Sequence, residues 1–179
     1  MGIEQRAPKS AHSVACSPQV SLVRHWSPLR LLWDQRVGSR YPQTALAIVA
    51  TDVDEHLLER ARAACYAKSS LRELPPEWID RAFDRREGLY CLREPCNTGI
   101  EFRRQDIRIA QPLGEFDLVL CRNVAFTYFS EPVQHAVLAH IAERLRVDGF
   151  LVLGRHESLP SAACFLPATA APGIFRKSA

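Results

Sequence analysis

Short apolar segments alternate with amphipathic segments along most of this chain. Apolar runs of strand length predict β-strands over residues 19–26, 44–51, 100–104, 116–121 and 150–153. Apolar side chains at three- and four-residue spacing predict helices between these runs, beginning near residues 27, 55, 75 and 130. Because parallel strands need helical crossovers, the alternation predicts a mostly parallel sheet with helices on both faces, an α/β fold.

Local signals support the predicted helix starts. Asp54 can cap the helix that begins at Glu55, because its carboxylate can accept a hydrogen bond from a free amide of the first turn. Pro28 and Pro132 suit the first turns of two other helices, where an amide proton would have no partner within the helix.

The remaining segments show neither periodicity. Residues 1–18 are polar and predict a loose N-terminal arm, which leaves residues 19–179 as a single domain. Residues 84–99 and 154–171 contain Pro, Gly, Asn or Ser and predict loops. Residues 173–176 predict a last strand at an edge of the sheet.

Composition argues against a nucleic-acid-binding, membrane, secreted or zinc-binding protein. The net charge is only +3, so a nucleic-acid partner is not expected. No apolar run approaches the roughly 20 residues of a membrane span, and the N-terminus lacks an apolar signal core. We therefore expect no membrane insertion and a cytoplasmic location, in which the six cysteines stay reduced and disulfides are not expected. No Cys or His set has the spacing of a zinc site, so no metal is expected.

Polar side chains follow three of the predicted strands. Asp52 follows the second strand, Asp106 the third, and Arg122 and Asn123 the fourth. In open parallel sheets, ligands bind at the carboxyl ends of the strands, and an acid after the second strand can accept hydrogen bonds from a ribose diol. The alternative for Asp52 is a turn or cap role. Since Asp54 already fills the cap, a ligand role is favoured.

Four longer strings occur in a characteristic order. They are ATDVDEHLLERARAACY, SSLRELPPEWIDRAF, FDLVLCRNVAFTYF and LRVDGFLVLGRHESLP. Together they resemble the CheR-type methyltransferases, which esterify glutamates on bacterial chemotaxis receptors, over roughly residues 45–176. The resemblance implies a Rossmann-like class I methyltransferase fold and S-adenosylmethionine as methyl donor.

The resemblance also implies roles for individual residues. Asp52 would bind the ribose hydroxyls, and Asp106 and Ile107 would flank the adenine. Asn123 would face both the cofactor and the acceptor, and Tyr128 would border the transferred methyl group. The alternatives are structural: Arg122 as an ion-pair partner, Tyr128 packed under the next helix, and His156 and Glu157 only ordering their loop.

The sequence departs from the family in two places. The family has a glycine-rich turn between its first strand and first helix, where the backbone approaches the cofactor. In this chain no glycine lies between Gly2 and Gly38, and the turn is expected to be deleted near residues 27–28. Receptor methyltransferases also carry a helical N-terminal domain, for which the 1–18 segment is too short.

Two functions remain open at this level. The first is an S-adenosylmethionine-dependent methyltransferase whose acceptor is a carboxylate of a protein glutamate or of a small molecule. The alternative is a catalytically inactive, truncated binding module, as the missing turn would suggest. A nicotinamide-dependent oxidoreductase is disfavoured because the chain has no G-x-G-x-x-G sequence. The sequence does not determine the oligomeric state.

Overall fold

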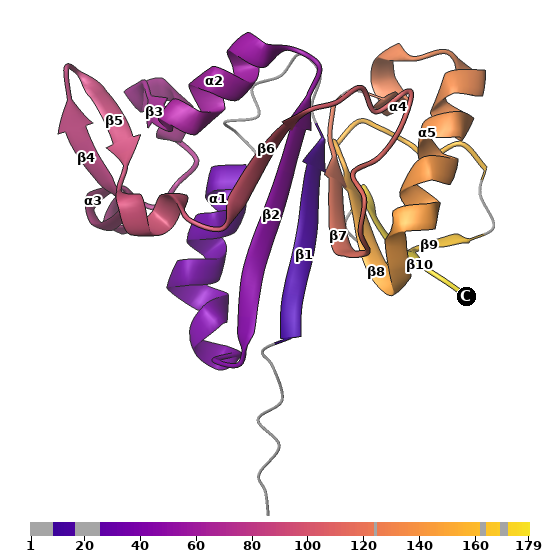
Figure 1. The fold of residues 1–179 in the computed structure, drawn as a ribbon, viewed down its shortest axis with the longest axis horizontal. Coiled ribbons are helices and arrows are strands. Elements are labelled where there is room, and N and C mark those ends of the chain that lie inside the picture. The colour runs from indigo at the N-terminus through magenta and orange to yellow at the C-terminus, as the bar shows by residue number, and fades with distance from the viewer. Residues whose placement is uncertain (1–8, 17–25, 124, 162–163, 169–171) are drawn as a thin grey trace, which may run out of the picture.

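The protein is an α/β sandwich built on one large sheet (Figure 1). The computed structural model describes residues 9–16, 26–123, 125–161, 164–168 and 172–179. The seven-stranded sheet has the order β6-β2-β1-β7-β8-β10-β9. Its strands are β1 (Lys9–Cys16), β2 (Thr44–Asp52), β6 (Ile100–Arg104), β7 (Phe116–Cys121), β8 (Leu145–Leu153), β9 (Phe165–Pro167) and β10 (Ile174–Lys177).

In this large sheet, the strands β6, β2, β1, β7 and β8 run parallel to one another, and only β10 and β9 are antiparallel to their neighbours. The predicted strands over residues 44–51, 100–104, 116–121 and 150–153 are therefore confirmed. This strand order, with helical crossovers and an antiparallel end, is the mostly parallel, Rossmann-like sheet that the sequence predicted.

The first strand is not where the sequence placed it. Lys9–Cys16, which was assigned to a loose arm, forms β1 and pairs with β2 along its whole length and with the end of β7. Residues 19–25 of the predicted strand lie outside the described residues, and Trp26 begins a helix. The segment KSAHSVAC has no continuous apolar run, so its place in the sheet depends on pairing with two distant strands rather than on local pattern.

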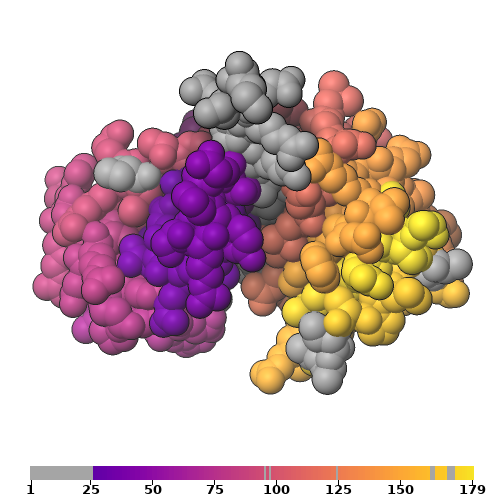
Figure 2. Space-filling model, turned by 90° about the horizontal axis from the view of Figure 1, so that it is seen from below, coloured from indigo at the N-terminus to yellow at the C-terminus, as the bar shows by residue number. Residues whose placement is uncertain are grey.

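Helices cover both faces of the sheet. They are α1 (Trp26–Leu32), α2 (Glu55–Ala63), α3 (Pro76–Ala82), α4 (Ala125–Tyr128) and α5 (Glu131–Arg144). Neighbouring residues of β2 point to opposite faces: Ile48 packs in one apolar cluster with Leu31 of α1, and Val49 packs in another with Ile141 of α5. Figure 2, seen from below the first view, shows the purple and magenta residues on one flank of the molecule and the orange and yellow, C-terminal residues on the other.

Most helix predictions are confirmed at their starts. Asp54 caps α2 by accepting a hydrogen bond from the His56 amide at 2.9 Å. The helix ends at Ala63, because Ala64 adopts a left-handed conformation with φ 50°. α1 continues through a π-helical turn, Trp33–Val37, and a 3-10 turn, Gly38–Arg40. Further 3-10 turns occur at Lys68–Leu71 and Glu94–Asn97.

The predicted loop over residues 84–99 contains a β-hairpin instead. Strands β4 (Phe83–Arg86) and β5 (Leu89–Leu92) are antiparallel, and β3 (Cys65–Tyr66) pairs with β5 to complete a second, three-stranded sheet. Glu87 and Gly88 between the two strands both have positive φ, 50° and 82°. Positive φ at both central residues matches the twist of a tight hairpin, a signal that the sequence reading overlooked.

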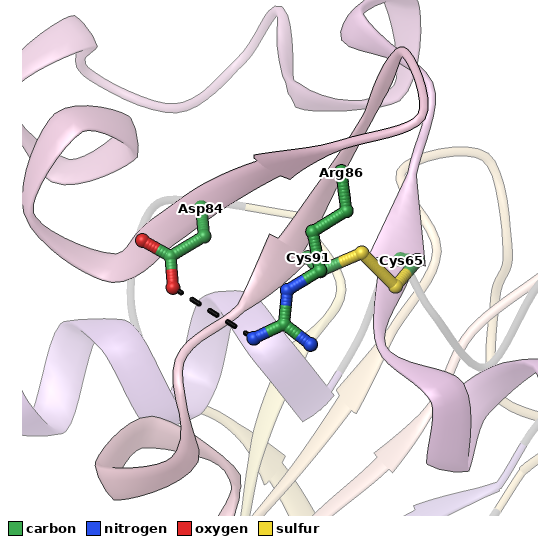
Figure 3. Close-up of a disulfide and its surroundings, with 4 residues drawn as sticks. All are labelled: Cys65, Asp84, Arg86 and Cys91. Atoms are coloured by element: carbon green, nitrogen blue, oxygen red, sulfur yellow. Dashed lines mark ion pairs between the residues drawn. A yellow bond between two sulfur atoms is a disulfide. The ribbon is translucent and has the colours of Figure 1, made fainter.

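A disulfide joins Cys65 of β3 to Cys91 of β5 (Figure 3), which contradicts the expectation that all cysteines are reduced. The expectation rested on compartment alone. The pairing register places these two residues directly opposite each other across the β3–β5 ladder, although 26 positions separate them in sequence. Arg86 and Asp84 form an ion pair on the neighbouring strand.

The C-terminal part of the sheet differs from the sequence reading. The strand predicted over residues 150–153 begins earlier, at Leu145 of β8, and includes Asp148, which has φ 65°; the register between β7 and β8 also shifts. The predicted edge strand is β10, but it lies between β8 and β9, so β9 is the edge. β9 itself falls inside the segment predicted as the 154–171 loop.

None of the described helices reaches the length and apolar character that a membrane span requires.

Candidate functional site

The carboxyl ends of the parallel strands meet at one edge of the sheet, the upper edge in Figure 1. The pairing registers define this edge, because Thr51, Cys16, Cys121 and Leu153 stand in one row across β2, β1, β7 and β8. Asp52 is the next residue of β2, and it pairs with Arg104 at the end of β6. The residues that follow each strand are therefore brought to a common rim, as the sequence predicted.

Asp52 is a buried carboxylate at this rim with one oxygen unused. Its side chain is 2% exposed, and Oδ1 accepts a hydrogen bond from the Asp54 amide at 2.9 Å. Oδ2 is buried and has no hydrogen-bond partner among the described residues. Burial raises the pKa of this carboxyl from 3.8 to about 6, and the nearby Asp54 charge adds to the shift. A buried acceptor without a partner is costly unless a ligand supplies the donor.

Asp106 and Ile107 follow β6 at the same edge. Both oxygens of Asp106 face the guanidinium of Arg108, with Nη2 2.5 Å from Oδ2. This hydrogen bond lowers the pKa of Asp106, so the carboxylate stays ionised. Ile107 is only 4% exposed and belongs to the apolar cluster beneath α5, so its side chain is a core residue as well as a neighbour of the rim.

Asn123 follows β7 and adopts a left-handed conformation with φ 58°. Asn tolerates this region better than most residues that carry a Cβ. Its side chain lies against the backbone of Gly154, the residue that follows β8: a Cβ on Gly154 would come within 2.1 Å of the Asn123 Oδ1 atom. Because Gly154 has no Cβ, the side-chain amide of Asn123 can occupy this space.

Glu157 holds these two strand ends together. It is 7% exposed, and its Oε2 accepts hydrogen bonds from the Asn123 amide at 2.6 Å and from the Gly154 amide at 2.7 Å. Its Oε1 accepts from the Thr127 hydroxyl of α4 at 2.9 Å. The sequence reading gave Glu157 at most a role in ordering its own loop, because no local pattern shows that the loop after β8 returns to the end of β7.

Tyr128 ends α4 with its side chain 67% exposed. It does not pack under the following helix, which was the alternative to a role at the site. The neighbouring Phe126 is 7% exposed and anchors α4 in the core, so the short helix presents Tyr128 outward.

A cavity of about 210 Å³ opens beside the rim. It is lined by Ser27 and Pro28 at the start of α1, by the segment Ser69–Leu74, and by Arg122 after β7. Arg122 forms no ion pair with any residue that the structure describes, so the structural alternative suggested for it is not supported. Sequence reasoning did not place the segment Ser69–Leu74 at the site.

The turn between the first strand and the first helix moves with the corrected strand. Ser27 and Pro28 lie inside α1, so the junction where a deletion was expected is a continuous helix. The connection from β1 to α1 falls on residues 17–25, which contain no glycine and lie outside the described residues. The loss of a cofactor loop, which the sequence analysis placed near residues 27–28, stays a prediction.

The donor and acceptor set at the rim fits an adenosine. A carboxylate oxygen without a partner can accept hydrogen bonds from a ribose diol, and a second carboxylate can accept one from an exocyclic amine. Within the described residues, no group of three His, Cys, Asp or Glu side chains is arranged to hold a metal ion.

Several known proteins are similar in sequence to this chain. A Pseudomonas aeruginosa chemotaxis protein methyltransferase 1 is 35% identical over 120 residues, which cover 65% of this chain and 43% of that protein. The chemotaxis protein methyltransferase of Salmonella typhimurium is 33% identical over 117 residues, 62% of this chain and 40% of that protein. An uncharacterised 104.1 kDa protein of Rhodobacter capsulatus is 34% identical over 125 residues, 70% of this chain and 13% of that protein.

This chain thus spans less than half of the length of these relatives. The family model for the S-adenosylmethionine-binding domain of CheR methyltransferases matches residues 31–171, most of the chain. The match includes Asp52, Asp106 and Asn123 at the rim and Glu157 behind it. The chain therefore belongs to the CheR methyltransferase family, and S-adenosylmethionine is the cofactor of its domain.

Proposed function

We propose that this protein transfers a methyl group from S-adenosylmethionine to a carboxylate, forming a methyl ester on a protein glutamate or on a small acid. The observation that carries the proposal is the buried Oδ2 of Asp52, which has no partner among the described residues and lies at the carboxyl edge of a parallel sheet. An unused buried acceptor at this position suits the hydroxyls of a ribose.

The rim residues would each hold a different part of the cofactor. Asp52 accepts hydrogen bonds from the ribose hydroxyls, and its second oxygen stays fixed by the Asp54 amide. Asp106 accepts from the exocyclic amine of the adenine, while Ile107 closes the apolar side of that pocket. The side-chain amide of Asn123 faces the cofactor and the acceptor. Glu157 and Gly154 stabilise the backbone conformation from which it projects.

The chemistry needs alignment more than acid–base assistance. S-adenosylmethionine supplies an electrophilic methyl group on a sulfonium, and transfer forms the O–CH₃ bond as the C–S bond breaks. A carboxylate acceptor is already ionised near neutral pH, so no residue has to remove a proton. Tyr128 and Asn123 border the methyl group and exclude water, which makes proximity and orientation the main source of rate.

Two features support a carboxylate as the acceptor. Arg122 lines the cavity at the rim and forms no ion pair with the described residues, so its guanidinium can bind an incoming anion. The matched relatives from Pseudomonas and Salmonella carry the name chemotaxis protein methyltransferase, which favours a protein acceptor over a small molecule.

Calorimetric titration with S-adenosylhomocysteine tests the cofactor site. We expect binding that Asp52→Asn weakens and that Asp80→Asn, an exposed carboxylate of α3, leaves unchanged. Transfer is then measured with methyl-labelled S-adenosylmethionine and glutamate-containing peptides, followed by mild base. Methyl esters release labelled methanol, whereas N-methyl products do not.

The outcomes separate the possible functions. No heat at millimolar S-adenosylhomocysteine would overturn the proposal at the level of the cofactor. Binding without any base-labile product would instead identify a non-catalytic binding module, and a base-stable product would identify a different acceptor.

A further inference from the structure

The loop after β8 carries a buried carboxylate, Glu157, to which the proposed function assigns no contact with a ligand. Glu157 lies behind the rim, and three donors from separate parts of the chain bond to it: the backbone amide of Asn123 beyond the end of β7, that of Gly154 after β8, and the Thr127 hydroxyl of α4. Two of the donors are backbone amides, at 2.6 and 2.7 Å from the same oxygen. Hydrogen bonds to a charged acceptor at these distances are among the stronger ones in proteins.

The position of these bonds matters more than their number. The Asn123 amide that bonds Glu157 belongs to a residue with φ 58°, a conformation that an unconstrained chain seldom keeps. Bonding the Asn123 and Gly154 amides to one oxygen fixes the distance between the ends of β7 and β8. The missing Cβ at Gly154 lets the Asn123 side chain occupy the space between the two ends.

We infer that Glu157 is a positioning residue of the cofactor site, which acts through Asn123 and, by way of Thr127, through α4. The inference rests on the proposed function only for the identity of the ligand. The carboxylate does not touch the reacting atoms. It bonds the backbone amide of Asn123 and so fixes the direction in which the Asn123 side chain faces the cofactor. It also holds the helix that presents Tyr128.

The central test compares Glu157→Gln with Glu157→Ala. Gln keeps an oxygen for the two amides and can turn its NH₂ toward the Thr127 hydroxyl, whereas Ala leaves all three donors without a partner. We expect affinity for S-adenosylhomocysteine to fall by less than about threefold in Glu157→Gln and by more than about tenfold in Glu157→Ala. Glu143→Ala, an exposed carboxylate of α5, serves as the matched control.

Measurements are made well below each variant's melting temperature, so that all molecules are folded. A carboxylate that contributes only to stability would lower the melting temperature and leave the affinity of the folded protein unchanged. That result in Glu157→Ala would overturn the inference, as would equal losses of affinity in the Gln and Ala variants.

Gly154→Ala tests the same geometry from the opposite side. The added Cβ would displace the side-chain amide of Asn123. We therefore expect a loss of affinity for S-adenosylhomocysteine comparable to that of Asn123→Gly. In the Asn123→Gly background the side chain that the Cβ would meet is gone, so Gly154→Ala should cost little more. Full additivity of the two losses would show that Gly154 does not act through Asn123.

A readout without ligand separates this inference from the proposed function. The amide protons of Asn123 and Gly154 should resonate far downfield in the wild-type protein, move slightly in Glu157→Gln and return to ordinary shifts in Glu157→Ala. If the wild type binds no S-adenosylhomocysteine but shows these shifts, the proposed function fails and the positioning network stands. Ordinary shifts in the wild type would overturn the network itself.

Discussion

Two carboxylates are buried at the same edge of the sheet, yet their surroundings differ. Glu157 has donors for both of its oxygens, and they come from the strand ends and from α4. Asp52 has one oxygen bound to the Asp54 amide and the other without a partner among the described residues. The carboxylate with donors on both oxygens joins the strand ends, while the other keeps a buried acceptor that we propose the ribose hydroxyls of the cofactor use. Hydrogen-bond satisfaction therefore distinguishes architecture from binding more clearly than burial does.

The largest expected difference between the two is in stability. Glu157→Ala leaves the backbone amides of Asn123 and Gly154 without this acceptor, at about 1–3 kcal/mol each, so the free energy of unfolding should fall by about 2–6 kcal/mol. Asp52→Asn removes a charge that burial disfavours and should not lower this free energy at pH 7.5. Denaturant titration of both variants measures the contrast, and an equal loss in the two would remove the distinction.

At Asp52 we expect a change in affinity for the ligand, although we expect no loss of stability. Hydrogen bonds from hydroxyls to a charged acceptor contribute about 1.5–3 kcal/mol, so Asp52→Asn should weaken S-adenosylhomocysteine binding by roughly 10- to 100-fold. The same substitution keeps the shape of the side chain, which excludes a packing effect. Unchanged affinity in a calorimetric titration would show that the Oδ2 atom of Asp52 does not face the ligand.

The raised pKa of Asp52 predicts a pH dependence of smaller size. Its pKa is 3.8 without burial and about 6 in the fold, so between these values the folded state binds more protons than the unfolded state. Stability should therefore fall as pH rises from about 4 through 6, by at most about 3 kcal/mol, and this contribution should level off about one pH unit above the folded pKa.

Binding should show the reverse trend, because the ribose hydroxyls prefer the ionised acceptor. Affinity for S-adenosylhomocysteine should rise as pH increases through about 6 in the wild type. The Asp52→Asn variant, which has no carboxyl at this position, is the control. A wild-type profile that matches the variant profile between pH 5 and 7 would assign the titration to another group.

The smallest effect is expected at Asp106, a partly buried carboxylate of the rim whose partner Arg108 is exposed. Its ion pair with Arg108 lies in solvent, and such pairs contribute little to stability. Arg108→Gln should leave the melting temperature unchanged and should free Asp106 for an adenine amine, so binding should stay the same or improve slightly. Weaker binding in thermal-shift titrations would mean that Arg108 itself contacts the ligand.

Local pattern was sufficient for much of the fold and for part of the site. The apolar runs placed β2, β6 and β7, and the Asp54 cap placed the start of α2, because each of these depends on residues close in sequence. Asp52, Asp106 and Asn123 could be selected as rim residues because parallel strands end at a common edge. Their ligand roles stay predictions until binding is measured.

Tertiary structure decided what depends on distant partners. Lys9–Cys16 became a central strand because two other strands pair with it, although its own residues suggest an arm. Cys65 met Cys91 because a hairpin that the sequence reading overlooked set the register between them. Glu157 gained its role only when its loop returned to the end of β7. In each case the stabilising contact joins segments far apart in the chain, and local sequence carries little information about such contacts.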